Sequence, residues 1–477
     1  GGKWLYVSIG NREGFVQSGH VERQFSNRDR YMKATEAVSV YDNRSGSLVK
    51  VGELVEGEEY RRYEASPEWH RIQFGDYKAF VKKEDTQVLL KKYKKNYSLQ
   101  NYYIGTIVAK RDTEIYDNTG KRLDPFGLLK KNQELAVVKE YNSWYEVVFG
   151  ERYGFVRKEH VSDNVMKAKT IVNPKQVYTY QKMVNDIRML EQNYHYIINT
   201  EKIGKSVDGR DLHAVKLGRG NTKITINGSH HAREWLTTNL IMNQINTYAK
   251  AYVNGSKYDG YDVQDLLNKV TIYYVPMVNP DGVTLVQQGP YALNNSSYLI
   301  SLNNGSTNFR HWKANARGVD LNRQYPAGWS TIKNNTGKPS SERFKGNSPL
   351  SEPEVIALYN FTRKHNFKSH VAYHSSGEVL YWAYNSTGKE RSLYRSIANM
   401  ISNKTSYSLV MPSNNPSGGG YTDWVIDSLG MPAFTPEISP YVGQRPVPIK
   451  NFDRIWSQNN SVGLLLAEEA YRNRLYR

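Results

Sequence analysis

The first 165 residues carry one pattern of hydrophobic and polar positions three times. Each copy starts with a Trp and continues with apolar residues at alternating positions. A Gly follows the Trp by six positions, and a Phe-Val pair follows by eleven and twelve. The copies start at Trp4, Trp69 and Trp144. Alternation with a period of two on both sides of a Gly turn predicts a β-hairpin with one buried face, so the front of the chain is expected to be all-β.

The second and third copies also share an upstream half, in which a Tyr-Asp-Asn string at 41–43 and again at 116–118 precedes an apolar run. The first copy lacks this half, so we expect the chain to begin inside a repeat. The predicted segments are a partial repeat at 1–30, repeats at 31–95 and 103–163, a linker without a clear period at 164–176, and a second domain at 177–477.

Behind the repeats the hydrophobic period changes. Apolar residues recur at helical spacing from Met183 to Tyr194. An apolar run at 224–226, a helical stretch at 235–252 and another apolar run from 270 follow. Strands that alternate with helices predict an α/β domain with a mixed, mostly parallel central sheet flanked by helices. The functional site of such a domain lies on the loops at the strand ends.

Length and charge limit the classes of function. A chain of 477 residues exceeds the roughly 250–300 residues of a single core, so two or more domains are expected. It contains no cysteine, so a metal must be bound by His and carboxylates. The formal charge of +18 favours an anionic partner. We find no motif that selects nucleic acid and no stretch near the ~20 apolar residues of a membrane span.

A candidate metal motif follows the apolar run at 224–226. His231 and Glu234 are three residues apart at the predicted entry to a helix, where a ring nitrogen and a carboxylate can face one ion. Zinc accepts such nitrogen and oxygen ligands, and a hydrolytic zinc site needs three protein ligands and an open position for water. The His-x-x-Glu spacing is weakly specific when it stands alone.

The strings around and beyond this motif resemble the zinc metallocarboxypeptidase family of the carboxypeptidase A and T type. The resemblance covers about 300 residues, and the motifs stand in the family's order. The matching strings are Gly228-Ser229-His230-His231-Ala232-Arg233-Glu234-Trp235, Asn279-Pro280-Asp281-Gly282, Gly318-Val319-Asp320-Leu321-Asn322-Arg323, Ala372-Tyr373-His374-Ser375, Ser417-Gly418-Gly419-Gly420 with Asp423-Trp424, and Phe434-Thr435-Pro436-Glu437-Ile438.

The resemblance implies a zinc peptidase with one Zn²⁺ ion. It makes His231, Glu234 and His374 the metal ligands and Glu437 the residue that activates the attacking water. It places Arg233 on the substrate-binding side of the cleft. It also implies that Asn322 and Arg323 bind a substrate carboxylate beside the scissile bond, for which a planar, bidentate guanidinium is suited.

Four positions depart from the family pattern. Lys313 stands where the family has an arginine that stabilises the oxyanion, so either this lysine or Arg317 is expected to supply the charge. Asn415 stands where the family has a mobile tyrosine, and Tyr421 either compensates or packs in the core. Thr422 occupies the position that sets side-chain selectivity. Glu378, an additional carboxylate four residues past His374, is a candidate acceptor for a substrate ammonium group.

These departures favour a zwitterionic side chain, such as that of meso-diaminopimelate. The string from Trp312 to Pro326 is similar to bacterial family members that cut γ-D-glutamyl–diaminopimelate bonds. The N-terminal repeats resemble bacterial SH3-like modules, small β-barrels that hold cell-wall peptidoglycan. We therefore expect a hydrolase of peptidoglycan peptides, secreted or wall-associated in a Gram-positive bacterium. The alternatives are a wall-tethered general carboxypeptidase and, third, a non-catalytic wall-binding protein.

Overall fold

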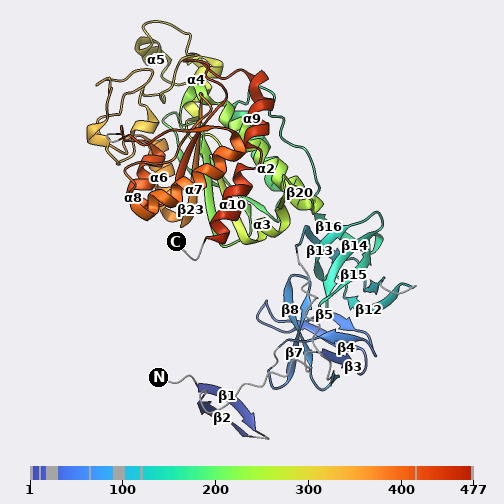
Figure 1. Ribbon diagram of the computed structural model, residues 1–477. Helices are drawn as coiled ribbons and strands as arrows, with labels where there is room; N and C mark the ends of the chain where they lie inside the picture. Colours follow the sequence, from blue (N-terminus) through green and yellow to red (C-terminus); the bar gives the residue numbers. More distant parts are fainter. Residues whose placement is uncertain are drawn as a thin grey trace. The chain divides into compact units, whose positions relative to one another are not determined.

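The computed structural model divides the chain into two compact units, Gly1–Val165 and Met166–Arg477 (Figure 1). The first unit is built almost entirely from strands, and the second combines strands with helices. None of the described helices is long and apolar enough to cross a membrane. The described residues are 4–9, 12–17, 31–63, 66–89, 102–118, 122–413 and 416–473.

Each of the three segments that start with a Trp folds as the predicted hairpin. In every copy the strand that begins at the Trp pairs antiparallel with the strand that carries the Phe-Val pair. The strand pairs are β1 (Trp4–Ile9) with β2 (Arg12–Gln17), β7 (Trp69–Phe74) with β8 (Tyr77–Lys82), and β14 (Trp144–Phe149) with β15 (Arg152–Arg157).

The second and third repeats close one β-barrel together. Each repeat contributes four strands to a ring of eight, in the order β15-β11-β12-β5-β4-β8-β7-β14, and β14 pairs back with β15. The all-β prediction is therefore confirmed, and the ring is shared by the two repeats. The strands not yet named are β4 (Val38–Asp42), β5 (Val49–Leu54), β11 (Thr113–Asp117) and β12 (Asp124–Leu129).

The two repeats meet along β5 with β12 and along β7 with β14. At the second seam Phe74 lies opposite Phe149, and their rings are 5.3 Å apart. The N–H of Gly75 donates to the carbonyl of Val148, and the N–H of Gly150 donates to that of Gln73, each at 2.7 Å. Both glycines have positive φ, 56° and 58°. A Cβ on Gly150 would come within 2.6 Å of a tyrosine ring carbon, so the seam requires glycine there.

The other described strands of the first unit lie outside this ring. One three-stranded sheet has the order β6-β3-β9, and three further strands extend the barrel sheet beyond β14 in the order β13-β10-β16. Their bounds are β3 (Tyr31–Ala34), β6 (Glu59–Arg61), β9 (Thr86–Leu89), β10 (Gly105–Ala109), β13 (Glu134–Glu140) and β16 (Val161–Val165), with a 3-10 helix at Lys158–His160.

The second unit contains a mixed sheet of eight strands in the order β17-β18-β22-β19-β23-β26-β24-β25. The four central strands β22, β19, β23 and β26 run parallel, as predicted, and the outer pairings are mostly antiparallel. The bounds are β17 (Ile198–Lys205), β18 (Asp211–Gly218), β19 (Thr222–Gly228), β22 (Val270–Val275), β23 (Phe367–Ser375), β24 (Val379–Tyr381), β25 (Ser408–Leu409) and β26 (Ala433–Ile438).

Helices cover this sheet, as the α/β prediction requires (Figure 1). Helices α2 and α10 pack against β19, and α8 packs against β23 and β26. The helices are α1 (Tyr180–Asn193), α2 (Leu236–Asn254), α3 (Val263–Lys269), α4 (Pro280–Gln288), α5 (Ser296–Leu302), α6 (Pro353–Lys364), α7 (Gly388–Thr405), α8 (Tyr421–Leu429), α9 (Phe452–Asn459) and α10 (Val462–Arg472). Strands β20 (Lys257–Tyr258) and β21 (Tyr261–Asp262) form a small hairpin, and 3-10 helices span Ala232–Glu234, Pro290–Ala292, Leu321–Arg323, Trp329–Thr331 and Ile449–Asn451.

The segment predicted to be a linker, 164–176, is held largely by the second unit. The amides of Ile171 and Val172 donate to Asn246 on α2, at 2.8 and 3.0 Å. The hydroxyl of Tyr194 donates to the carbonyl of Lys169. A chain tied down by these hydrogen bonds is an extension of the second unit and not a free tether.

Candidate metal centre and active site

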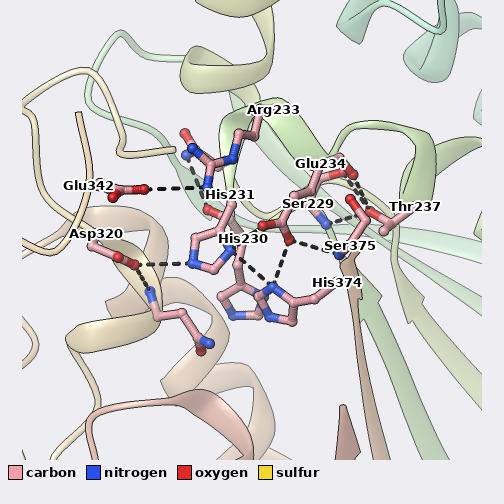
Figure 2. Close-up of polar contacts among 12 residues, drawn as sticks. Ser229, His230, His231, Arg233, Glu234, Thr237, Asp320, Glu342, His374 and Ser375 are labelled. Carbon is pink, nitrogen blue, oxygen red and sulfur yellow. Dashed lines mark hydrogen bonds and ion pairs between the residues drawn. The ribbon is translucent and has the colours of Figure 1, made fainter. Parts of the chain in front are cut away.

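Three buried side chains converge at the carboxyl ends of the central strands (Figure 2). His231 follows β19 and directly precedes the 3-10 helix Ala232–Glu234, which carries Glu234, while His374 lies near the end of β23. Because β19 and β23 are parallel neighbours, their carboxyl ends bring the loop ligands and the strand ligand to one place. The structure thus brings together all three predicted metal ligands.

The donor set fits one zinc ion. The Nδ1 atoms of His231 and His374 are 3.0 Å apart, and each lies 2.8 Å from an oxygen of Glu234. Two ring lone pairs and a carboxylate repel one another unless a proton or a cation lies among them. Zinc bonds of about 2.0–2.2 Å would separate neighbouring ligand atoms by roughly 3.3–3.5 Å, so a small outward shift admits the ion.

Electrostatics keep the carboxyl group of Glu234 ionised. Burial alone would raise the pKa of the Glu234 carboxyl, but the imidazoles of His231 and His374 hold that pKa well below its usual range. His230 is buried and stacks on His374, and its Nε2 lies 3.2 Å from the hydroxyl of Tyr325. It is not part of the ligand group.

Asp320 orients the first ligand. Its Oδ1 lies 3.1 Å from Nε2 of His231, and it is fully buried. A proton on Nε2 that is donated to this carboxylate leaves Nδ1 free to face the metal, which is the usual arrangement behind a metal-binding histidine. Asp320 stands in the motif at 318–323, but the sequence alone assigned no role to it.

Glu437 lies on β26, opposite His374 in the parallel ladder. Burial and the nearby Glu234 raise the pKa of its carboxyl to about 7, against the opposing effect of His374, Lys313 and Arg233. A general base works best when its pKa is near the operating pH. Glu437 lines the cleft beside the metal ligands, where a water molecule could be deprotonated.

Two pockets meet at Lys313 and Glu437. The first pocket, of about 420 Å³, is lined by Asn322, Arg323 and Thr422 among others. The second pocket, of about 450 Å³, lies on the side of Arg233. If the scissile peptide bond lies at Lys313 and Glu437, the substrate residues on its two sides therefore enter different pockets.

Lys313 is the cation that faces the reacting position. It lines both pockets. Arg317, the alternative, has a side chain 53% exposed, lies 3.7 Å from Glu352, and lines neither pocket. The geometry favours the lysine.

Arg233 lines the second pocket, on the side away from Thr422. One guanidinium nitrogen donates to the carbonyl of His311 at 2.7 Å, and another lies 3.3 Å from Glu342 (Figure 2). These contacts hold the guanidinium in place next to the metal ligands.

The first pocket carries charges of both signs. Asn322 and Arg323 supply an amide and a guanidinium, and Thr422 shares a hydrogen bond of 2.9 Å with Thr435. Asp423, to which no role was assigned from the sequence, adds a carboxylate. Burial raises the pKa of Asp423 to about 6.

Two predicted substrate residues lie elsewhere. Tyr421 is fully buried, and its hydroxyl is bonded to Thr362 and His370, so the prediction that it contacts substrate is wrong and it packs in the core. Glu378 binds Arg454 through two contacts of 2.7 Å and lines neither pocket. It is already neutralised, and its proposed role as an ammonium acceptor is corrected. Asn415 lies outside the described residues.

Tyr381 is a residue of the cleft that the motifs did not reveal. It ends β24, is 47% exposed, and lines both pockets. Burial and the nearby Glu437 raise the pKa of its phenol, so it stays protonated and can donate a hydrogen bond. The short apolar run 379–381 after His374 was the available signal, because a strand there must lie close to the metal.

Comparison with known proteins defines the class. The zinc carboxypeptidase family model matches residues 183–460, more than half of the chain. The chain therefore belongs to the zinc carboxypeptidase family. Together with the His-Glu-His site, this makes it a zinc peptidase with one metal ion.

Several known proteins are similar to this chain. The γ-D-glutamyl-L-diamino acid endopeptidase 1 of Lysinibacillus sphaericus is 38% identical over 302 residues, 62% of this chain and 73% of that protein. The uncharacterized protein YqgT of Bacillus subtilis (strain 168) is 31% identical over 329 residues, 65% of this chain and 86% of that protein. Bovine thrombin-activatable fibrinolysis inhibitor, solved with a tick carboxypeptidase inhibitor, shares the fold. Its TM-score is 0.52 at 19% identity, over 63% of this chain and 99% of that one.

Proposed function

We propose that this protein hydrolyses the γ-D-glutamyl–meso-diaminopimelate bond of peptidoglycan stem peptides. The observation that carries the proposal is the first pocket, where Arg323 and Asp423 place a cation and a carboxylate in one cavity. Meso-diaminopimelate that is acylated on one amine presents carboxylates and a free ammonium group, which match these two charges. The relative from Lysinibacillus sphaericus, named as a γ-D-glutamyl-L-diamino acid endopeptidase, supports the same substrate class.

Each group of the site would have a separate role in the hydrolysis. A bound zinc ion supplies a Lewis acid that makes a water molecule a nucleophile near neutral pH. Glu437 takes a proton from the attacking water and returns it to the leaving amine. Lys313 stabilises the negative charge that develops on the scissile carbonyl oxygen. Asn322 and Arg323 hold a carboxylate of the departing diaminopimelate.

The barrel would hold the enzyme at the wall of a Gram-positive bacterium after secretion. Its two repeats present the same pair of half-buried rings, Tyr41 with Trp69 and Tyr116 with Trp144, edge to face at 5.7 and 5.6 Å. The formal charge of +18, which belongs to the whole chain, suits an anionic wall polymer. Such paired aromatic faces with nearby cations suit a peptide-bearing glycan.

Cosedimentation with purified peptidoglycan tests this attachment. Trp69→Ala with Trp144→Ala should reduce the bound fraction severalfold, and Tyr291→Ala, an exposed aromatic residue in the other unit, serves as the control. Equal binding of the double variant and the wild type would sink the proposed role of these rings.

A wall-tethered general carboxypeptidase is the second candidate. It would use the same metal site and the Asn322–Arg323 clamp, and it is favoured by the family assignment. The third candidate, a non-catalytic wall-binding protein, would not require the complete set of ligands and Glu437.

Digestion of defined substrates separates the three candidates. The enzyme is incubated with muropeptides that contain diaminopimelate and with ordinary peptides that have free C-termini, and the products are identified by mass spectrometry. Cleavage of the muropeptides at the γ-D-glutamyl bond is expected. Trimming of the ordinary peptides alone would support the general carboxypeptidase, and no cleavage by zinc-loaded protein would support the binding protein.

A further inference from the structure

The second pocket carries positive charge beyond that of Lys313 and Arg323, the two cations that the proposed reaction uses. Five of its lining residues are basic. Its acids are Glu234, which faces the metal, Glu437, which is the proposed base, and Glu342. The basic residues are Arg233, Lys313, Arg323, Lys333 and Arg343.

Glu342 is shared between two guanidinium groups. It lies 3.3 Å from Arg233, 3.3 Å from Nε of Arg343, and 3.4 Å from the side-chain amide of Gln444. One carboxylate between two arginines leaves one positive charge unmatched within this group. The contacts are also longer than the 2.7–2.9 Å of a close charged hydrogen bond, so the arginines keep capacity for a second anion.

Arg343 is fixed at the pocket by its backbone while its side chain stays accessible. Its N–H donates to Oδ2 of Asp320 at 3.2 Å, and the other oxygen of Asp320 holds His231. Its φ is 68°, a left-handed conformation that few residues with side chains adopt. The side chain is 56% exposed and lines the second pocket. The backbone of Arg343 is therefore set relative to the metal ligands, and the contact with Glu342 brings its guanidinium to the pocket.

The acyl side of a γ-glutamyl bond has an unusual chemistry. Because the glutamate is linked through its side chain, its α-carboxyl group stays free and ionised, a short alkyl chain away from the scissile carbonyl. An ordinary α-linked peptide presents a neutral amide on that side. A pocket that prefers an anion next to the scissile bond would distinguish the two.

We propose that Arg343, together with Arg233, binds the free α-carboxylate of the γ-D-glutamyl group and so selects γ-linked substrates. This inference rests on the proposed function and adds the residue that reads the acyl side of the bond. Arg343 is a specificity determinant and takes no part in the proton transfers.

Two matched substrates test this inference. One is the tripeptide L-Ala-γ-D-Glu-meso-diaminopimelate. The other is the same tripeptide with an α-amide in place of the α-carboxylate of its D-Glu residue. For the wild-type enzyme, kcat/KM should be about 10- to 100-fold higher for the carboxylate, as expected for a charged hydrogen-bonded pair. Arg343→Gln should lose this preference by lowering kcat/KM for the carboxylate while leaving the amide substrate unaffected. Arg343→Lys should restore part of it. Arg445→Gln, an exposed arginine outside the pocket, should keep the wild-type preference.

The outcomes separate this inference from the proposed function. Equal cleavage of both substrates by the wild type overturns the carboxylate subsite and leaves the proposed function standing. A preference that persists in Arg343→Gln overturns the assignment to this residue. Cleavage of neither substrate by zinc-loaded enzyme overturns both proposals. The rate on the amide substrate also reports whether each variant is folded.

Discussion

Asp320→Ala should weaken zinc binding although Asp320 is not a ligand. The carboxylate receives Nε2–H of His231 at 3.1 Å and thereby keeps Nδ1, the atom that faces the other two ligands, free of a proton. Without the carboxylate, the imidazole can carry its proton on Nδ1, where it opposes a cation, and the ring is free to rotate. The same change removes the acceptor for the backbone N–H groups of Asn322 and Arg343.

The size of the effect follows from this role. Loss of a partner behind a metal-binding histidine typically costs about 10- to 100-fold in metal affinity, which corresponds to about 1.4–2.7 kcal/mol. Asp320→Asn keeps one acceptor oxygen, which can still receive Nε2–H of His231, and replaces the other with an amide NH₂ donor, so its loss of zinc affinity should be smaller than that of Asp320→Ala. The measurement is a zinc competition titration against a chromophoric chelator at fixed pH, with the full chain.

The control is Asp186→Asn, which alters another fully buried aspartate that binds Tyr178 and Lys182 away from the metal. It should leave zinc affinity unchanged even if it lowers stability. Zinc affinity of Asp320→Ala within twofold of the wild type would refute the view that this carboxylate sets the tautomer of the first ligand.

Three other substitutions test separate parts of the structure. Glu437→Gln should lower kcat by about 10²- to 10⁴-fold with unchanged zinc content by elemental analysis; retained turnover would remove it as the base. Lys313→Met should lower kcat/KM by about 10²- to 10³-fold, and Arg317→Met should lower it only slightly. A larger loss in Arg317→Met than in Lys313→Met would show that Arg317 stabilises the oxyanion. Gly150→Ala, with φ of 58° and a ring carbon 2.6 Å from the new Cβ, should lower the free energy of unfolding by about 2–4 kcal/mol in urea. Gly57→Ala, with no atom within 4 Å of the new Cβ, should cost only the strain of its φ. Equal losses of unfolding free energy in the two variants would contradict the view that the barrel seam requires glycine at position 150.

The sequence was most informative where chemistry is local. His231, Glu234 and His374 could be assigned because each stands in a short motif, and the hairpins because their alternation extends over neighbouring residues. The joint closure of the barrel could not be predicted, because it depends on contacts between repeats such as Phe74 with Phe149.

The residues that line the substrate pocket could not be predicted from local motifs either. Tyr421 and Glu378 stand next to functional motifs in the sequence, but a helix turns the first into the core and Arg454 neutralises the second. Asp423 and Tyr381 line the cleft because α8 packs against the sheet and β24 pairs with β26 within it. Which side of a helix or strand faces a cavity is decided by packing between distant segments, and no single motif reports it.

The most direct test of the account is the position of the bond that is cut. The zinc-loaded enzyme is incubated with L-Ala-γ-D-Glu-meso-diaminopimelate in H₂¹⁸O, and the products are sequenced by tandem mass spectrometry. The proposed function predicts free diaminopimelate without label and L-Ala-D-Glu with one ¹⁸O in the γ-carboxyl group of glutamate. Label in any other carboxyl group, or an intact tripeptide beside trimmed ordinary peptides, would contradict it.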